Sequence, residues 1–394
     1  MKYLDQADVK GKRVLVRVDY NVPLNGDFEV TDDRRIRESI PSLTYILENG
    51  GSAVLMSHLG RPKSGPEDKF SLHHTISTIK KYVDAEIKFA DDCISDAAFE
   101  MSANLQPGEV LLLNNLRFYG EEKKGDEAFA EKLSKHGDIY VNDAFGTAHR
   151  AHASTTIAAK FFEEKYCGFL LKKEIENAEK VLNSTEKPVC AIMGGAKVSD
   201  KIMIIENLLD RVDYLLIGGG MAYTFLRAKG QRIGKSLLED DKVATAASLM
   251  KKARAKNVTI LTPVDSVASS EFGEDGKIQV VRNESFPDDM MGLDIGPETF
   301  QYFYDTILDS KIILWNGPMG VFEMDSFAKG TMAVAEAVVK ATENGSFSLI
   351  GGGDSAAAIA KAGLEDKVSY VSTGGGALLE YLEGKTLPGI AALG

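Results

Sequence analysis

The 394-residue chain has few cysteines, no long uncharged run and no leader-like start. Its three cysteines are too widely spaced for a disulfide framework or a zinc site, which favours buried free thiols in a reducing compartment. The longest uncharged stretch near the middle, Tyr214–Leu226, contains three glycines and is shorter than the roughly 20 apolar residues of a membrane span. The start carries Asp5, Asp8, Lys10 and Lys12 before the short apolar run Val14–Val16, which is not the pattern of a secretory signal. We therefore expect a cytoplasmic protein without a membrane anchor.

Positive charge is also scarce, with 46 basic against 58 acidic residues and a net charge of −12. This balance repels nucleic-acid backbones and excludes non-specific nucleic-acid binding in bulk, although it leaves room for a local basic pocket. The content of 44% hydrophobic and 26% charged residues is that of an ordinary globular protein. The length predicts two or three domains.

Short β-branched runs alternate with longer helical patterns along the whole chain, as in the predicted strand Arg13–Val18 and the predicted helix Arg35–Leu47. This rhythm indicates an α/β fold with parallel sheets and helices on both faces of each sheet. Further strands are expected at Ser52–Met56, Glu109–Leu113, Asp138–Val141, Val189–Met193, Tyr214–Ile217, Thr259–Leu261, Lys311–Trp315, Phe347–Ile350 and Lys367–Val371. Further helices are expected at Leu72–Tyr82 and Asp126–Leu133.

A charged amphipathic pattern, Leu170–Leu182, lies between two such α/β sets. We interpret it as a helix that joins two domains. The predicted organisation is a first domain over 1–169, a connecting helix over 170–183 and a second domain over 184–376.

Basic residues follow the predicted strands of the first half. In open α/β sheets, ligands bind outside the carboxyl ends of the strands. Four separate strand–helix junctions each offer one arginine, with imidazoles nearby: Arg35, Arg61, Arg117 and Arg150. Guanidinium groups bind carboxylates and phosphates bidentately, so the pattern predicts a pocket for a small polyanion.

Glycine clusters follow the strands of the second half. Backbone amides of such clusters, followed by a helix start, form cradles for phosphate. Lys197 and Lys201 are four residues apart and would share a helix face if that helix began by Lys197. Asp354, directly after Gly353, is placed to hold Mg²⁺, which takes only one or two protein carboxylates.

Three other motifs are weaker. Gly230–Ser236 looks like a P-loop but has three residues between its glycines where four are needed, so we interpret it as a loop. Gly351–Ala356 fits the dinucleotide pattern G-x-G-x-x-A, but the next strand offers no acid for a ribose. His149 and His152 have no cysteine or acid to complete a metal site, which favours hydrogen-bonding or anion-binding roles.

An anion pocket in one domain and a glycine-lined phosphate site in the other indicate phosphoryl transfer between a nucleotide and an acidic metabolite. Such transfer needs positioning and charge neutralisation more than a strong base. Two other classes remain open: a nicotinamide-dependent dehydrogenase that uses the Gly351 cluster, and a two-lobed binding protein without catalysis. Binding of NAD rather than ADP would indicate the first, and inactivity in an ATP-dependent assay the second.

Ten segments, in order along the whole chain, resemble the phosphoglycerate kinase family. They are Arg17–Pro23, Ser57–Pro62, Asn115–Phe118, Asn142–His152, Gly194–Lys201, Ile217–Ala222, Leu293–Pro297, Trp315–Glu323, Gly351–Ser355 and Val371–Ala377. The resemblance implies two Rossmann-like domains facing across a cleft, with the tail 377–394 packing back on the first. It implies reversible phosphoryl transfer from 1,3-bisphosphoglycerate to Mg-ADP after domain closure, in a monomer.

The resemblance also implies roles for individual residues. Those matching phosphoglycerate-binding positions are Asp19, Asn21, Arg35, His58, Arg61, Arg117 and Arg150. Those matching nucleotide-binding positions are Lys201, Gly218, Gly219, Gly292, Leu293, Asn316, Glu323, Gly352, Gly353, Asp354 and Ser355, with Asp354 as the metal ligand. Those matching groups at the transferring phosphoryl are Arg35, Lys197, Gly353 and Gly376.

Departures from the family pattern are few. Tyr20 stands where a phenylalanine is usual, and Asn114 where a glutamate is common. The Pro23–Arg35 loop is about one residue longer than usual, so Arg34 is an alternative to Arg35, although the Arg-Ile-Arg context favours Arg35.

Overall fold

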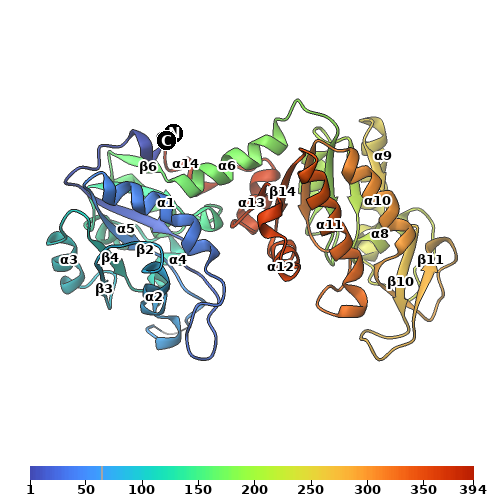
Figure 1. Cartoon of the computed structure of the whole chain (residues 1–394), viewed down its shortest axis with the longest axis horizontal. Coiled ribbons are helices and arrows are strands. Elements are labelled where there is room, and N and C mark those ends of the chain that lie inside the picture. Colours follow the sequence, from blue (N-terminus) through green and yellow to red (C-terminus); the bar gives the residue numbers. More distant parts are fainter. Residues whose placement is uncertain (64) are drawn as a thin grey trace. The chain divides into compact units, whose positions relative to one another are not determined.

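A computed structural model describes residues 1–63 and 65–394 of the chain. The chain divides into two compact units (Figure 1). The first unit comprises Met1–Glu176 and Thr386–Gly394, and the second comprises Asn177–Lys385. Among the described residues, no helix has the length and apolar character needed to cross a membrane.

The first unit is built on a six-stranded sheet in the order β3-β4-β2-β1-β5-β6, and all of its neighbouring strands are parallel. Its strands are β1 (Arg13–Val18), β2 (Ser52–Met56), β3 (Ile87–Ala90), β4 (Val110–Leu113), β5 (Ile139–Asp143) and β6 (Lys165–Cys167). Because both faces of such a sheet are covered, the central strands are continuously buried, as in the VLLL sequence of β4. Along β1, Val16 and Val18 pack in one core with Ile36 and Leu43, while Arg17 points to the opposite face.

Helices connect these strands. They are α1 (Arg34–Glu48), α2 (Ile76–Ile79), α3 (Asp96–Ala103), α4 (Gly120–Lys124), α5 (Glu127–Ser134) and, from the end of the chain, α14 (Pro388–Ala391). Ser95 and Asp126 cap α3 and α5 by accepting hydrogen bonds from backbone N–H groups of the first turn. Helix α6 (Phe169–Leu182) begins in the first unit and ends in the second.

The second unit has a parallel six-stranded sheet in the order β15-β14-β13-β7-β8-β9 and a three-stranded antiparallel sheet in the order β11-β10-β12. The parallel strands are β7 (Val189–Met193), β8 (Tyr214–Ile217), β9 (Thr259–Leu261), β13 (Ile312–Asn316), β14 (Phe347–Gly351) and β15 (Tyr370–Val371). The antiparallel strands are β10 (Asp265–Ser269), β11 (Ile278–Arg282) and β12 (Met291–Ile295). The helices are α7 (Ile202–Leu208), α8 (Met221–Ala228), α9 (Val243–Ala255), α10 (Pro297–Asp309), α11 (Lys329–Glu343), α12 (Gly353–Lys361) and α13 (Gly376–Leu382).

The α/β fold with two parallel sheets confirms the predicted fold class. Five predicted strands, Arg13–Val18 among them, have the observed bounds, and the other five differ by one to three residues at one or both ends. The predicted helix Leu72–Tyr82 is wrong in extent, because only Ile76–Ile79 is α-helical and a 3-10 turn over Leu72–Thr75 precedes it. The sequence reading missed β3, β6 and the whole antiparallel sheet, and Gly230–Ser236 is a loop as predicted.

The last residues divide differently from the prediction. Residues 377–385 lie in the second unit, and only Thr386–Gly394 lie in the first. Gly389 fixes the end of the chain there, because its N–H donates to Ala148 O at 2.8 Å and its carbonyl accepts from Asn142 Nδ2 at 3.1 Å. The crossing therefore begins after Lys385 and not after Gly376.

Candidate active site

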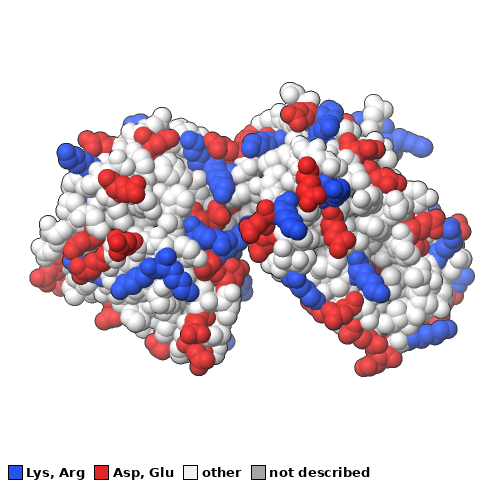
Figure 2. All heavy atoms as spheres, in the orientation of Figure 1, with Lys and Arg blue, Asp and Glu red and all other residues white. Residues whose placement is uncertain are grey.

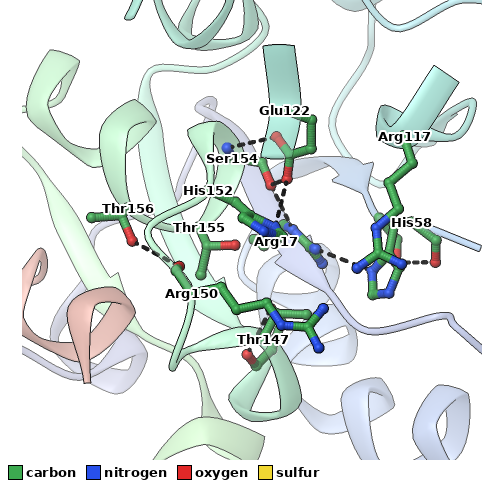
Figure 3. Close-up of polar contacts among 12 residues, drawn as sticks. Arg17, His58, Arg117, Glu122, Thr147, Arg150, His152, Ser154, Thr155 and Thr156 are labelled. Atoms are coloured by element: carbon green, nitrogen blue, oxygen red, sulfur yellow. Dashed lines mark hydrogen bonds and ion pairs between the residues drawn. The ribbon is translucent and has the colours of Figure 1, made fainter. Parts of the chain in front are cut away.

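In the first unit, polar side chains gather at the carboxyl ends of β1, β2, β4 and β5, which meet at one edge of the sheet. Figure 3 shows the side chains of Arg17, His58, Arg117, Arg150 and His152 turned toward one region from different elements. This group is called the arginine cluster below.

Just after β1, the Asp19 carboxylate and the Asn21 backbone carbonyl hold Arg35. The buried Asp19 Oδ2 lies 3.2 Å from Arg35 Nη1, which also donates to the Asn21 carbonyl at 3.1 Å. Asn21 Oδ1 accepts from the Gly60 N–H at 2.8 Å. The Arg35 side chain is 34% exposed, so its guanidinium is held in place and is still accessible to a ligand.

Within the arginine cluster, Arg17 is buried. Its Nε donates to Ser154 Oγ at 2.8 Å, and its Nη2 lies 3.3 Å from His58 Nδ1. Ser154 in turn donates its N–H and Oγ–H to the carboxylate of the buried Glu122, at 2.9 and 2.6 Å. Figure 3 shows this network of contacts, which runs from Glu122 through Ser154 to Arg17 and His58 and orients both side chains.

The electrostatics of the cluster show uncompensated positive charge. Burial holds the pKa of His58 well below its usual range, and the guanidinium groups of Arg17, Arg117, Arg35 and Arg150 lower it further. Burial, followed by the guanidinium groups of Arg17, Arg117 and Arg150, lowers the pKa of His152 to about 4. His152 Nδ1 also lies 3.9 Å from the Glu122 carboxylate, but burial and several cations outweigh this single carboxylate, which already accepts two hydrogen bonds from Ser154.

Arg117 contributes to the same excess of charge. Its Nη1 donates to the Gly60 carbonyl at 2.8 Å, while its buried Nε has no hydrogen-bond partner among the described residues. Burial, together with Arg150 and Arg17, lowers the pKa of Arg117 to about 10. The positive charges that lower these pKa values also favour the binding of an anionic ligand.

The two remaining arginines are exposed. Arg150 Nε lies 3.0 Å from His149 Nε2, and its charge reaches His58. Arg61 follows β2, and among the described residues no side chain or carbonyl holds its guanidinium. The structure therefore brings Arg35, Arg117 and Arg150 to His58 and leaves Arg61 at the margin.

Sequence reasoning missed Arg17 and Glu122 as parts of this site. The signal was present, because Arg17 is an internal charge in the otherwise apolar strand RVLVRV. In a sheet covered on both faces, a charged side chain is buried only when it has hydrogen-bond or ion-pair partners.

In the second unit, a pocket of about 450 Å³ opens beside the glycine-rich strand ends. It is lined by Gly195, Ala196, Gly219, Gly220, Lys235, Leu237, Phe272, Met291, Gly292, Leu293, Pro318, Gly320, Val321, Glu323 and Asp354. Bare backbone and apolar side chains form most of its wall, and Glu323 and Asp354 are its only carboxylates among the described residues. This composition suits a flat apolar ring that carries polar groups at one end.

Five of the residues predicted to bind nucleotide line this pocket: Gly219, Gly292, Leu293, Glu323 and Asp354. Gly218 instead packs behind it, where a Cβ would lie 2.3 Å from the Met319 sulfur. Ser355 also faces inward, since its Oγ accepts from the Gly317 N–H at 2.6 Å. Gly218 and Ser355 therefore contribute to the packing of the strand ends, and neither lines the pocket.

Lys201 stands at the start of α7 and hydrogen-bonds to Asn316 Oδ1. Asn316 Nδ2 donates to the Gly351 carbonyl at 2.8 Å, which ties the ends of β13 and β14 together. Burial lowers the pKa of Lys201, while the carboxylates of Asp200, Asp354 and Glu383 raise it. Lys201 and Asp354 are therefore close enough to act on one ligand.

Lys197 does not share a helix face with Lys201, because α7 begins only at Ile202. The two lysines would have shared a face only if the helix had begun by Lys197. Lys197 lies in the loop after β7 and is exposed.

Two helix starts supply free backbone amides. Gly352, with φ +90°, precedes α12, and Gly375, with φ +43°, precedes α13, which begins at Gly376. A Cβ at Gly353 would meet nothing within 4 Å, so the first turn of α12 is open. The exposed Asp354 carboxylate stands at this turn, in a setting that fits a Mg²⁺ ion held by one carboxylate, water and substrate phosphates.

The fold and the two sites define a two-unit α/β phosphotransferase, with the arginine cluster in one unit and the glycine-lined pocket in the other. Comparison with known proteins identifies the particular family. The family model for phosphoglycerate kinase matches residues 4–385. The chain therefore belongs to the phosphoglycerate kinase family, and its reaction is the ATP-generating phosphoryl transfer of glycolysis.

Individual relatives agree with this assignment. The chain is 50% identical to phosphoglycerate kinase of Porphyromonas gingivalis, over 99% of both chains. It is 51% identical to that of Chloroherpeton thalassium, over 100% of this chain and 98% of the relative. Among solved structures, phosphoglycerate kinase of Coxiella burnetii superposes with a TM-score of 0.88 at 39% identity, covering 99% of this chain and 97% of that one. The dehydrogenase and the non-catalytic binder are thereby excluded.

Proposed function

We propose that the first unit binds the carboxyl end and phosphate of phosphoglycerate, and that the second binds Mg-ADP or Mg-ATP. The observation that carries this division is the placement of uncompensated positive charge. Four guanidinium groups lower the pKa of His58 in the first unit, whereas the second unit offers a glycine-lined pocket with Lys235, Glu323 and Asp354 in its wall and Lys201 near Asp354.

In the first unit, Arg117 and Arg150 bind the anionic groups of the substrate, with Arg61 adding charge at the margin. Asp19 and Asn21 have a different role, because the Asp19 carboxylate and the Asn21 carbonyl already bind Arg35, and the Asn21 side chain accepts from the Gly60 N–H. They position Arg35 for the reacting carboxyl group. His58 stays neutral and donates or accepts a hydrogen bond, since its pKa lies well below neutrality.

In the second unit, the apolar wall formed by Leu293 and its neighbours receives the base, and Glu323 accepts hydrogen bonds from the ribose. Lys201, Asn316 and the amides of Gly352 and Gly353 bind the phosphates. Asp354 would hold Mg²⁺, which supplies charge neutralisation and orientation to the phosphate chain.

The reaction needs no general base. In the direction of ATP formation, a β-phosphate oxygen of ADP attacks the phosphorus of the acyl phosphate, and the P–O bond to the acyl group breaks. The leaving group is a carboxylate that stays ionised at neutral pH. Arg35, Lys197 and the amides of Gly353 and Gly376 stabilise the charge on the transferring group.

Because the two ligands bind to separate units, we propose that closure of the units precedes transfer and excludes water. The chain acts as a monomer in the cytoplasm.

A coupled assay with 3-phosphoglycerate and Mg-ATP tests the activity, and variants test the division between units. Arg117→Ala and Arg150→Ala should weaken binding of 3-phosphoglycerate in calorimetry and leave ADP binding unchanged. Lys201→Ala should do the reverse. Weaker ADP binding in the two arginine variants would contradict the proposal.

A further inference from the structure

The second unit has a second cavity, remote in sequence from the glycine clusters. It is a groove of about 760 Å³ between the end of α9 and the edge strand β9. Its lining residues are Lys229, Met250, Lys251, Arg254, Asn257, Val258, Thr259 and Ile260. This α9–β9 groove contains three cationic side chains and, among the described residues, no carboxylate.

Neighbouring cations on the same helix show that this lack of carboxylates is local. Lys252 pairs with Glu206, and Lys256 pairs with Asp210, so one row of α9 is neutralised by α7 and the turn after it. Lys251 and Arg254, three residues apart, form a different row that faces the groove. No carboxylate within the described part of the chain pairs with either of them.

Cations near the end of a helix stabilise its C-terminus through the helix dipole, and Lys252 and Lys256 already do so for α9. Lys229, the C-cap residue of α8, brings a third cation into the groove from a different helix. Its Nζ donates to Thr262 Oγ1 at 2.7 Å, which fixes the ammonium beside the strand edge. Three cations from two elements thus converge in a protein whose net charge is −12.

The strand edge adds backbone donors. β9 is the last strand of its sheet and pairs only with β8. The Thr259 N–H donates to Asp213 O at 2.9 Å, so in this parallel ladder the N–H of the next residue, Ile260, turns away from β8 toward the groove. Cations and an outward amide are the groups that bind phosphate oxygens.

We propose that the α9–β9 groove binds a compact polyanion of the polyphosphate class. Several cations spaced along a groove suit a chain of phosphates better than a single anion. The ligand carries no nucleobase, because no aromatic side chain among the described residues lines the groove for a base to stack on, in contrast to Phe272 in the 450 Å³ pocket.

Titration calorimetry with inorganic tripolyphosphate tests the proposal on the full chain, with saturating Mg-ADP and 3-phosphoglycerate present to occupy the catalytic sites. The wild type should bind one further equivalent, with an affinity that falls as salt rises. Lys251→Ala/Arg254→Ala should weaken this binding at least 10-fold. The matched control Lys252→Ala/Lys256→Ala removes the same charge from the same helix and should change it by no more than about 3-fold.

Two results would overturn the proposal: no additional equivalent on the wild type, or the same loss of affinity in both double variants. The amide resonance of Ile260 gives a local second readout in the unmodified protein. It should shift on addition of tripolyphosphate, and an unchanged resonance under saturating probe would place the binding elsewhere.

Discussion

In the proposed mechanism, charge neutralisation at the reacting carboxyl group depends on Arg35. Asp19 and the Asn21 carbonyl hold its guanidinium in place before any ligand binds, so little reorganisation is needed. We predict that Arg35→Ala lowers kcat by roughly 10²–10³ and leaves the affinities for both substrates within a few fold. Steady-state kinetics and calorimetry measure the two quantities.

The neighbouring Arg34 is the matched control, since it stands one residue earlier in α1 and was the alternative assignment. Arg34→Ala should keep kcat near that of the wild type. If the loss of turnover occurs in Arg34→Ala and not in Arg35→Ala, the assignment of the catalytic arginine is wrong.

The histidines of the arginine cluster report its charge. The pKa of His152 is about 4 in the folded chain and near 6.5 in the unfolded one. The imidazole resonances of His152 should therefore show no protonation above pH 5.5 in the free protein, and 3-phosphoglycerate should raise the midpoint by offsetting the guanidinium charge. A midpoint near 6.5 in the free protein would contradict the charged cluster.

The same shift affects stability. Because the unfolded imidazole takes up a proton near pH 6.5 and the folded one only near pH 4, this group's contribution to the free energy of unfolding declines as the pH falls through that window. His58, whose pKa is also lowered, acts in the same direction.

At the scale of elements, the glycine-rich strand ends pack against one another as well as facing ligands. Gly219 has φ +64°, and a Cβ there would lie 2.6 Å from the backbone of Gly195. Gly219→Ala should lower the melting temperature and weaken ADP binding, because both the left-handed backbone and the close contact disfavour a side chain. Thermal unfolding and calorimetry measure these effects.

Gly230 is the control for backbone strain, since its φ is +82° and a Cβ there would meet nothing within 4 Å. Gly230→Ala should cost only about 1 kcal/mol, the usual penalty of the left-handed conformation, and should leave ADP binding intact. Equal effects of the two substitutions on ADP affinity would show that crowding between the strand ends is unimportant.

The sequence predicted the central strands well because their apolar runs are long and bounded by glycine or charge. It missed β6, which has only three residues, and β11, which is half-exposed over Ile278–Arg282. It also missed β10 and β12, which are largely buried, because polar residues and glycine interrupt their apolar pattern, as in DSVAS and MGLDI. The Leu72–Tyr82 pattern carries helical spacing, yet the structure shortens it to one turn after a 3-10 segment. Tertiary contacts decide the conformation of such short segments and override their local helix preference.

The candidate site was predictable to the extent that its residues follow strands. Asp354 was predicted in this way, and Gly292, which lies inside the missed strand β12, came only from the family resemblance. The inward roles of Gly218 and Ser355 depend on contacts with Met319 and Gly317 that no spacing reveals. The position of Lys197 depended on where α7 begins, and the sequence left that condition open.

For the whole molecule, substrates bound to separate units require the units to approach for transfer. We predict that the radius of gyration in solution scattering decreases when 3-phosphoglycerate and Mg-ADP are both present and changes less with either alone. An unchanged radius with both ligands would count against closure.

The central claim is that each unit binds one substrate, and amide resonances of the full chain test it most directly. Titration with 3-phosphoglycerate should shift the resonances of Arg117 and His152 and leave those of Gly219 and Gly292 in place. Mg-ADP should do the opposite. Shifts from both ligands confined to one unit would contradict the account.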